Sequence, residues 1–102
     1  MATTTFEVLA EPARRRILDL LIGGSRPVGE LVHETGLSQP NTSRHLRILR
    51  EAGLVESHAE GQRRLYALRR DGFAEIERWL APYVGLWHDG LGELERHLDR
   101  MG

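Results

Sequence analysis

Two helical segments separated by a very short break constrain the fold more than any other feature of the sequence. Apolar residues recur at helical spacing through Val32, and Gly36 then ends that segment as a natural left-handed cap. Ser38, a favoured N-cap residue, begins the next helix, which we expect to run from about Gln39 to Ala52. Two helices joined by so short a turn predict a helix-turn-helix.

The remaining sequence predicts further helices and one hairpin. Apolar spacing is helical in three more stretches, 6–10, 12–22 and 73–101. Leu54–Ala59 and Gln62–Leu68 have the composition of two strands joined by a tight turn at Glu60 and Gly61. The 102 residues suffice for one ordinary domain. We therefore expect a single domain over residues 1–102, mainly α with a small β-hairpin, in the order α-α-α-α-β-β-α.

Charge is distributed unevenly along the chain, although the net charge is only −1. Residues 38–70 carry seven Arg and three acidic residues, a net charge of +4, whereas residues 71–102 carry three Arg and seven acidic residues, a net charge of −4. There is no Lys, and the planar guanidinium group of Arg makes paired hydrogen bonds to phosphate and guanine. The basic middle of the chain is therefore the part suited to nucleic acid.

The helix expected after Ser38 has one apolar and one polar face. At 100° per residue, Thr42, Leu46 and Leu49 fall together and should face the core. His45 lies at the edge of this face, where it could pack against the core or contact a DNA backbone. Polar groups near the helix start can reach base edges and phosphates in a major groove, although a merely solvated face has the same pattern. The contacts to double-stranded DNA predicted for this helix are Ser38, Gln39, Asn41, Ser43, Arg44, His45 and Arg47.

The predicted hairpin favours DNA binding over a merely solvated helix. Its turn places Gln62, Arg63 and Arg64 at or near the tip. A basic β-hairpin directly after a helix-turn-helix is the layout of a winged helix, whose wing lies along the DNA backbone beside the recognition helix. We therefore add these three residues to the predicted DNA contacts, since solubility is the weaker explanation for the two arginines.

Taken in order, these motifs resemble the ArsR family of winged helix-turn-helix transcriptional repressors. The segments that carry the resemblance are Leu9–Leu18, Val28–Leu31, Gly36–Pro40, Ser43–Leu46, Leu49–Val55 and Gly61–Tyr66. The resemblance implies a homodimer that binds a palindromic operator and represses transcription, often from its own promoter. Trp79–Tyr83, together with Leu86 and Trp87, resembles a branch of the family that lacks the well-known metal sites.

The last helix carries a heptad-like apolar seam with alternating spacings of three and four residues. This seam either packs on its own domain or meets a second copy of the chain. The resemblance implies the second arrangement, a homodimer in which the first helix and the last helix, about 73–101, form the interface. The interface residues predicted in this way are Phe6, Leu9, Leu80, Tyr83, Val84, Trp87, Leu91, Leu94 and Leu98.

Metal and cofactor sites have little support in the sequence. The chain has no Cys, which excludes disulfides and thiolate metal sites. His88, Glu93, His97 and Asp99 lie near one another on the last helix, but such spacing is usually that of a solvated helix face. We therefore expect no cofactor and no metal, and a non-thiol metal-responsive repressor stays an alternative.

Other functional classes fit the sequence less well. No nucleophile is arranged with His and Asp, and no glycine-rich phosphate loop is present, so we expect no enzyme. No apolar run approaches the roughly 20 residues that span a bilayer, and the start lacks a basic-then-apolar leader, which predicts a cytoplasmic protein without a membrane partner. The expected function is sequence-specific transcriptional regulation under an unidentified effector. A winged-helix protein-interaction module without DNA binding is the alternative.

Overall fold

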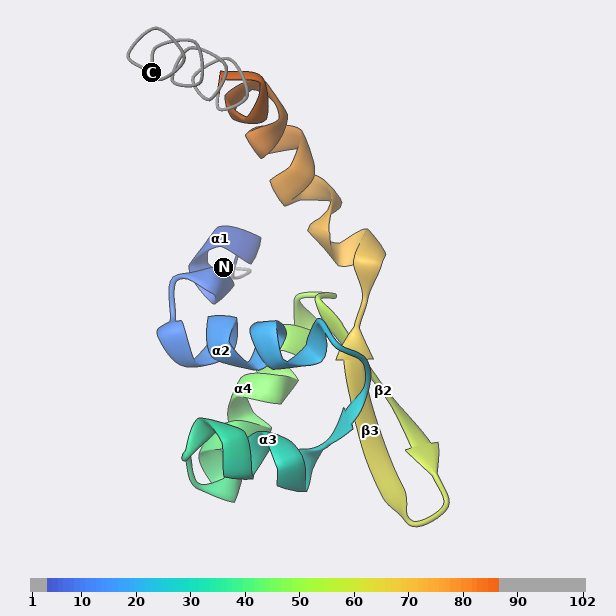
Figure 1. Cartoon of the computed structure of the whole chain (residues 1–102). Helices are drawn as coiled ribbons and strands as arrows, with labels where there is room; N and C mark the ends of the chain where they lie inside the picture. The colour runs from blue at the N-terminus through green and yellow to red at the C-terminus, as the bar shows by residue number, and fades with distance from the viewer. Residues whose placement is uncertain (1–3, 87–102) are drawn as a thin grey trace, which may run out of the picture.

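The computed structural model describes residues 4–86 of the chain, and Figure 1 shows the course of the backbone. The helices are α1 (Thr5–Leu9), α2 (Pro12–Leu21), α3 (Val28–Thr35) and α4 (Gln39–Glu51), and residues 74–86 are also helical. The strands are β1 (Arg26–Pro27), β2 (Val55–Glu60) and β3 (Arg63–Leu68), and the 3-10 turn η1 (Arg70–Phe73) follows them. The predicted winged helix-turn-helix fold, with its helices before and after a hairpin, is confirmed.

Local capping fixes the break of the helix-turn-helix. Gly36 ends α3 in the left-handed conformation, with a φ of 72°, and its N–H donates to the Val32 carbonyl. The Ser38 hydroxyl accepts a hydrogen bond from the Asn41 backbone N–H at 3.2 Å and so caps α4. The two residues that the sequence singled out therefore set both ends of the turn.

The sheet has three antiparallel strands in the order β1-β3-β2, one strand more than the hairpin that the sequence predicts. Arg26 pairs with Tyr66 and Pro27 with Leu65, so β1 lies at the free edge of β3. A strand of two residues is too short to show the alternation of apolar and polar residues that predicts a strand. Pro has no N–H to donate, so it is tolerated only in a strand that has no partner on one side. The third strand was missed because its only signal is a pairing with residues far along the chain.

The turn of the hairpin lies one residue later than predicted. Glu60 pairs with Arg63, which leaves Gly61 and Gln62 as the two turn residues. Gly61 has a φ of 61°, and no other type of residue has a positive φ in the described part of the chain. A positive φ at the first central position alone is the pattern of a type II′ turn, which favours Gly there. Gln62 is therefore at the tip, and Arg63 already belongs to β3.

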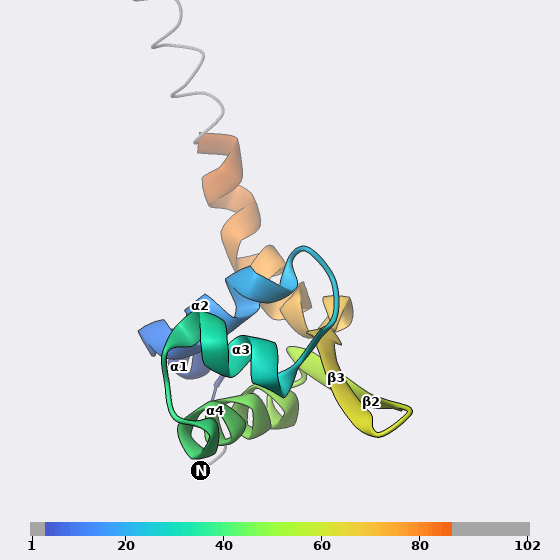
Figure 2. The same ribbon diagram turned by 60° about the horizontal axis from the view of Figure 1, so that its bottom comes forward.

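One apolar core lies between the four helices and the base of the hairpin. Figure 2 shows α4 beside α3, with the β2–β3 hairpin projecting to one side. In α4 the buried side chains include Thr42, Leu46 and Leu49, which confirms the predicted inner face of this helix. The buried apolar residues of the cluster are Val8, Ile17, Leu18, Leu21, Leu31, Leu46, Leu49, Leu54 and Val55.

A close backbone contact sets where the last helix begins. Gly72, in η1, packs against the turn that leads from α4 into β2, and a Cβ atom there would overlap the carbonyl oxygen of Gly53. The Arg69 N–H donates to the Leu54 carbonyl at 2.9 Å in the same corner. From this corner, residues 74–86 extend away from the domain (Figure 1).

Candidate nucleic-acid interface

The outer face of α4 carries polar and cationic side chains that the fold leaves exposed. Its side chains enclose a shallow hollow lined by Pro40, Ser43, Arg44 and Arg47. The predicted contact residues that lie exposed on or beside this helix are Ser38, Gln39, Asn41, Ser43, Arg44 and Arg47. The structure therefore leaves all but one of the residues predicted for this helix exposed to solvent, and of these it brings Ser43, Arg44 and Arg47 together around the hollow.

Ser38 already has a structural role at this surface. Its side chain caps α4, and its carbonyl accepts from both the backbone N–H and the hydroxyl of Thr42. The hydroxyl thus has one oxygen lone pair engaged by Asn41 and retains its own proton for another acceptor. Contact between Ser38 and DNA stays a prediction, and the capping role is what the structure shows.

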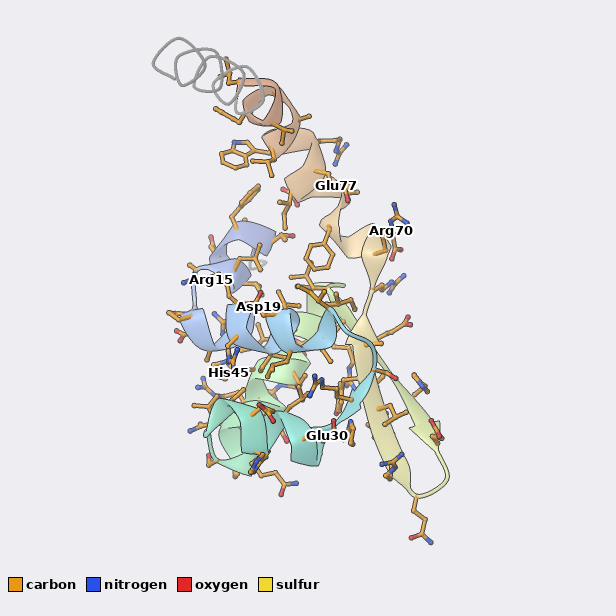
Figure 3. All side chains as sticks on the ribbon, in the orientation of Figure 1. Arg15, Asp19, Glu30, His45, Arg70 and Glu77 are labelled. Carbon is orange, nitrogen blue, oxygen red and sulfur yellow. The ribbon has the colours of Figure 1, made fainter. Side chains whose placement is uncertain are left out.

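His45 lies on the inner side of α4, close to α2 (Figure 3). Only 6% of the residue is exposed, and its Nδ1 atom is 3.4 Å from a terminal guanidinium nitrogen of Arg14. Burial lowers the pKa of the His45 imidazole, and the charges of Arg44 and Arg14 lower it further, while Glu11 acts in the opposite direction. Of the two roles left open by the sequence, burial favours packing, so we remove His45 from the candidate interface.

Two arginines from different elements meet at one hydroxyl between α4 and the hairpin. Arg50 donates to the Ser57 Oγ atom at 3.2 Å, and Arg64 donates to the same atom at 3.1 Å. The two guanidinium groups therefore lie side by side where α4 meets the sheet. Arg50 was not among the predicted contacts, because its approach to β3 depends on the tertiary fold.

The cationic groups of this surface form no salt bridge within the described residues. The salt bridges there join Arg26 to Glu30 and Arg69 to Asp71, both away from the outer face of α4. Five exposed arginines of α4 and β3 have no acidic side chain within salt-bridge distance in residues 4–86. They are Arg44, Arg47, Arg50, Arg63 and Arg64. Guanidinium groups gathered in this way attract a polyanion such as a DNA backbone.

A second surface, formed by α1 and residues 74–86, is apolar. The Phe6 ring lies edge-on to Trp79 with centroids 5.5 Å apart, and Trp79 lies 5.1 Å from Tyr83. The Thr5 hydroxyl donates to the Glu75 carboxylate at 3.3 Å, which also joins the two helices. The large apolar side chains exposed on this surface are Phe6, Trp79, Leu80, Tyr83, Val84 and Leu86.

The predicted interface residues fall only partly within this surface. Phe6, Leu80, Tyr83 and Val84 are among its exposed side chains, and Leu9 is half-buried against the core. The remaining predicted interface residues, Trp87, Leu91, Leu94 and Leu98, lie outside the described residues. The same holds for the residues named as a conceivable metal site, His88, Glu93, His97 and Asp99.

Residues 4–86 contain no cluster of three or more His, Asp or Glu side chains that could hold a metal ion. No helix in that range is long and apolar enough to cross a bilayer.

Sequence comparison relates the chain to bacterial regulators. The family model described as bacterial regulatory protein, arsR family, matches residues 11–57, which run from before α2 into β2. The transcriptional repressor SdpR of Bacillus subtilis (strain 168) is 33% identical over 79 residues, which cover 78% of this chain and 88% of SdpR. The uncharacterized HTH-type transcriptional regulator Rv0081 of Mycobacterium tuberculosis (strain H37Rv) is 42% identical over 72 residues, which cover 70% of this chain and 63% of that protein.

Solved structures show the same relation. The crystal structure of a possible transcriptional regulator for arsenical resistance is 38% identical and matches with a TM-score of 0.71, over 91% of this chain and 94% of that one. The solution structure of the homodimeric winged helix-turn-helix DNA-binding domain of Mb0332 from Mycobacterium bovis is 33% identical, with a TM-score of 0.62 over 82% of this chain and 74% of that one. Because this similarity in sequence and fold extends over most of SdpR and of both structures, the chain belongs to the arsR family of bacterial regulatory proteins and is a winged helix-turn-helix transcriptional regulator.

Proposed function

We propose that this regulator is a homodimeric repressor that acts in the cytoplasm by binding a palindromic operator in duplex DNA. The observation that carries the proposal is the cationic surface of α4 and β3, whose arginines have no acidic partner within residues 4–86. Repression is the activity named for the relative SdpR, and the Mb0332 domain is described as homodimeric and DNA-binding.

The proposed roles of the residues at the DNA interface follow from their positions on the surface. Near the start of α4, Gln39, Ser43 and Arg44 are exposed and carry the groups that read base edges in a major groove. Farther along, Arg50 and Arg64 lie together at Ser57 and are placed to hold phosphates, which position a protein on DNA without reading sequence. Arg47, Arg63, Asn41 and Gln62 complete the proposed interface.

The dimer is proposed to form through α1 and the helix that starts at residue 74. This surface exposes aromatic and aliphatic side chains next to one another, and a contiguous apolar patch on a soluble protein marks an interaction site. A small domain also gains stability by sharing a core with a second copy. The whole chain would then act as one domain, with its last helix used for dimerisation.

Selection of bound duplexes from a random DNA library tests the proposed function directly. With the full chain as bait, we expect one enriched sequence with two-fold symmetry and half-sites about 34 Å apart, one helical turn. Enrichment of a site without symmetry would contradict the homodimer on a palindrome. A failure to enrich any sequence would favour the alternative, a protein-interaction module that has lost DNA binding.

The hairpin arginines give a prediction about salt dependence. Replacing both Arg63 and Arg64 by Ala should weaken binding to all duplexes and lower the steepness of the log affinity against log salt plot by about 2, since each phosphate contact contributes about 0.9. Titrations of the selected duplex at several salt concentrations measure this slope. The control is Arg70→Ala, an exposed arginine near the start of the last helix and away from the hairpin tip (Figure 3). A slope equal to that of the control would exclude phosphate contacts by the hairpin.

A further inference from the structure

One guanidinium group connects three helices of the domain. Arg14, on α2, donates from Nε to the Val8 carbonyl of α1 at 2.7 Å. A terminal nitrogen of the same group lies 3.4 Å from Nδ1 of His45 on α4. Within residues 4–86, the Arg14 contact is the only side-chain hydrogen bond that joins α4 to another helix. Arg14 therefore holds a position that no neighbouring side chain duplicates.

Chemistry fixes the state of His45 in this contact. Arg has only N–H donors, so the Nδ1 atom of His45 must accept the hydrogen bond through its lone pair. The neutral ring then carries its proton on Nε2, and a protonated ring has no acceptor to offer. Protonation would also place a positive charge beside Arg14 and Arg44, with Glu11 as the acidic group nearby. The contact therefore requires neutral His45.

We propose that Arg14 is a positioning residue for DNA binding, which fixes α4 relative to α1 through the Val8 carbonyl and the imidazole of His45. The inference rests on the proposed function, in which α1 lies in the dimer interface and α4 reads the operator. The Phe6–Trp79 and Thr5–Glu75 contacts join α1 to the last helix, so Arg14 is the polar connection between the dimer helices and the reading helix. A dimer can engage two half-sites only if its two α4 helices keep a fixed separation and tilt.

A neighbouring arginine offers a matched control. Arg15 donates to the Leu9 carbonyl at 2.6 Å and to the Ala10 carbonyl at 3.1 Å, so it also satisfies the end of α1. It makes no side-chain contact with α4 among the hydrogen bonds of the described residues. The Arg15→Ala variant loses the same positive charge and also loses hydrogen bonds to the end of α1. It keeps the contact between Arg14 and His45.

The test measures affinity for the selected duplex together with the dimer state of the full chain in sedimentation. Arg14→Ala should bind about tenfold more weakly while remaining dimeric, because a hydrogen bond involving a charged group has roughly this effect on an equilibrium. Arg15→Ala should change affinity less than about twofold. His45→Asn keeps an acceptor near the Nδ1 position and should retain affinity, whereas His45→Leu packs but cannot accept and should resemble Arg14→Ala.

The pH profile separates positioning from a merely structural role. Burial lowers the pKa of His45 below its ordinary value of 6.5, so the ring is neutral at pH 7.5 and becomes protonated only on the acid side of 6.5. Wild-type affinity should therefore fall once the pH is lowered far enough below 6.5 to protonate His45, and the His45→Asn variant should not share this fall.

A measurement that does not involve DNA completes the experiment. Nitrogen NMR of the imidazole should show an unprotonated Nδ1 for His45 in the wild type at pH 7.5, and a ring protonated on Nδ1 would overturn the proposed contact. Equal affinities for Arg14→Ala and Arg15→Ala, with the wild type binding normally, would overturn the positioning role alone. A wild type that binds no duplex would instead overturn the proposed function, and the positioning role with it.

Discussion

Replacing Leu80 by Glu is expected to convert the proposed dimer to a monomer and to weaken operator binding at least about 100-fold. Leu80 is 40% exposed on the apolar surface formed by α1 and residues 74–86. Burying the exposed 40% of Leu80 contributes about 0.6–1.2 kcal/mol and desolvating the new carboxylate costs about 1–2 kcal/mol more, and a two-fold symmetric interface is affected twice. The loss of about 3–6 kcal/mol corresponds to a factor of roughly 10² to 10⁴ in the dimerisation constant. A monomer also loses the gain from holding two half-sites at once.

Sedimentation and duplex titration at the same protein concentration check this result. The control is Arg78→Glu, which also adds negative charge to the helix but lies about 160° from Leu80 at 100° per residue, on the opposite side. The control should remain dimeric and bind DNA with less than about a threefold change. If Leu80→Glu is still a dimer, the interface lies on another surface and the proposed role of α1 with the last helix is wrong.

The parts of the fold that depend on local chemistry were predictable from the sequence. The turn between α3 and α4 follows from Gly36, which ends α3 in the left-handed conformation, and from Ser38, which caps the start of α4. The buried face of α4 follows from helical spacing alone, as Thr42, Leu46 and Leu49 show. A hairpin after the helix-turn-helix follows from two strand-like segments around a Gly.

Features that depend on contacts between distant segments were not predictable in the same way. The strand β1 exists only through its pairing with Tyr66 and Leu65 on β3. Helical spacing places His45 at the edge of the core face, whereas in the fold it is buried and lies against Arg14 of α2. Likewise, the meeting of Arg50 with Arg64 requires β2 to bring Ser57 between them.

The exact position of the hairpin turn could not be predicted from the sequence for a different reason. A Gly between two strands is compatible with more than one two-residue turn, so the Gly61 signal alone does not choose between a turn at Glu60 and Gly61 and one at Gly61 and Gln62. The register of the strands makes the choice, because Glu60 pairs with Arg63. The candidate site was therefore recoverable as a set of exposed residues on α4, whereas its exact geometry at the hairpin was not.

Replacing Gly72 by Ala is expected to lower the free energy of unfolding by about 3 kcal/mol, at the upper end of what overpacking usually costs. The added methyl group would overlap the carbonyl oxygen of Gly53, a backbone atom that cannot turn aside as a flexible side chain would. Gly53 has a φ of 79°, and the next residue, Leu54, donates its N–H to the Leu49 carbonyl at 3.0 Å, so this turn is held in place. Thermal unfolding at fixed protein concentration should show a Tm lower by roughly 10–20 °C.

Gly29→Ala is the matched control for this substitution, because a Cβ atom at Gly29 meets nothing within 4 Å and Ala favours the helix α3 in which it lies. That variant should unfold at the wild-type temperature or above it. An unchanged Tm for Gly72→Ala would mean that η1 can lift away from the corner between α4 and β2 at little cost. In that case the last helix would not be held at a fixed angle to α4, and a dimer built on it could not set the separation of the two reading helices through this corner. A lowered Tm together with weakened operator binding in the surviving folded protein would tie the Gly72 contact to both stability and DNA recognition.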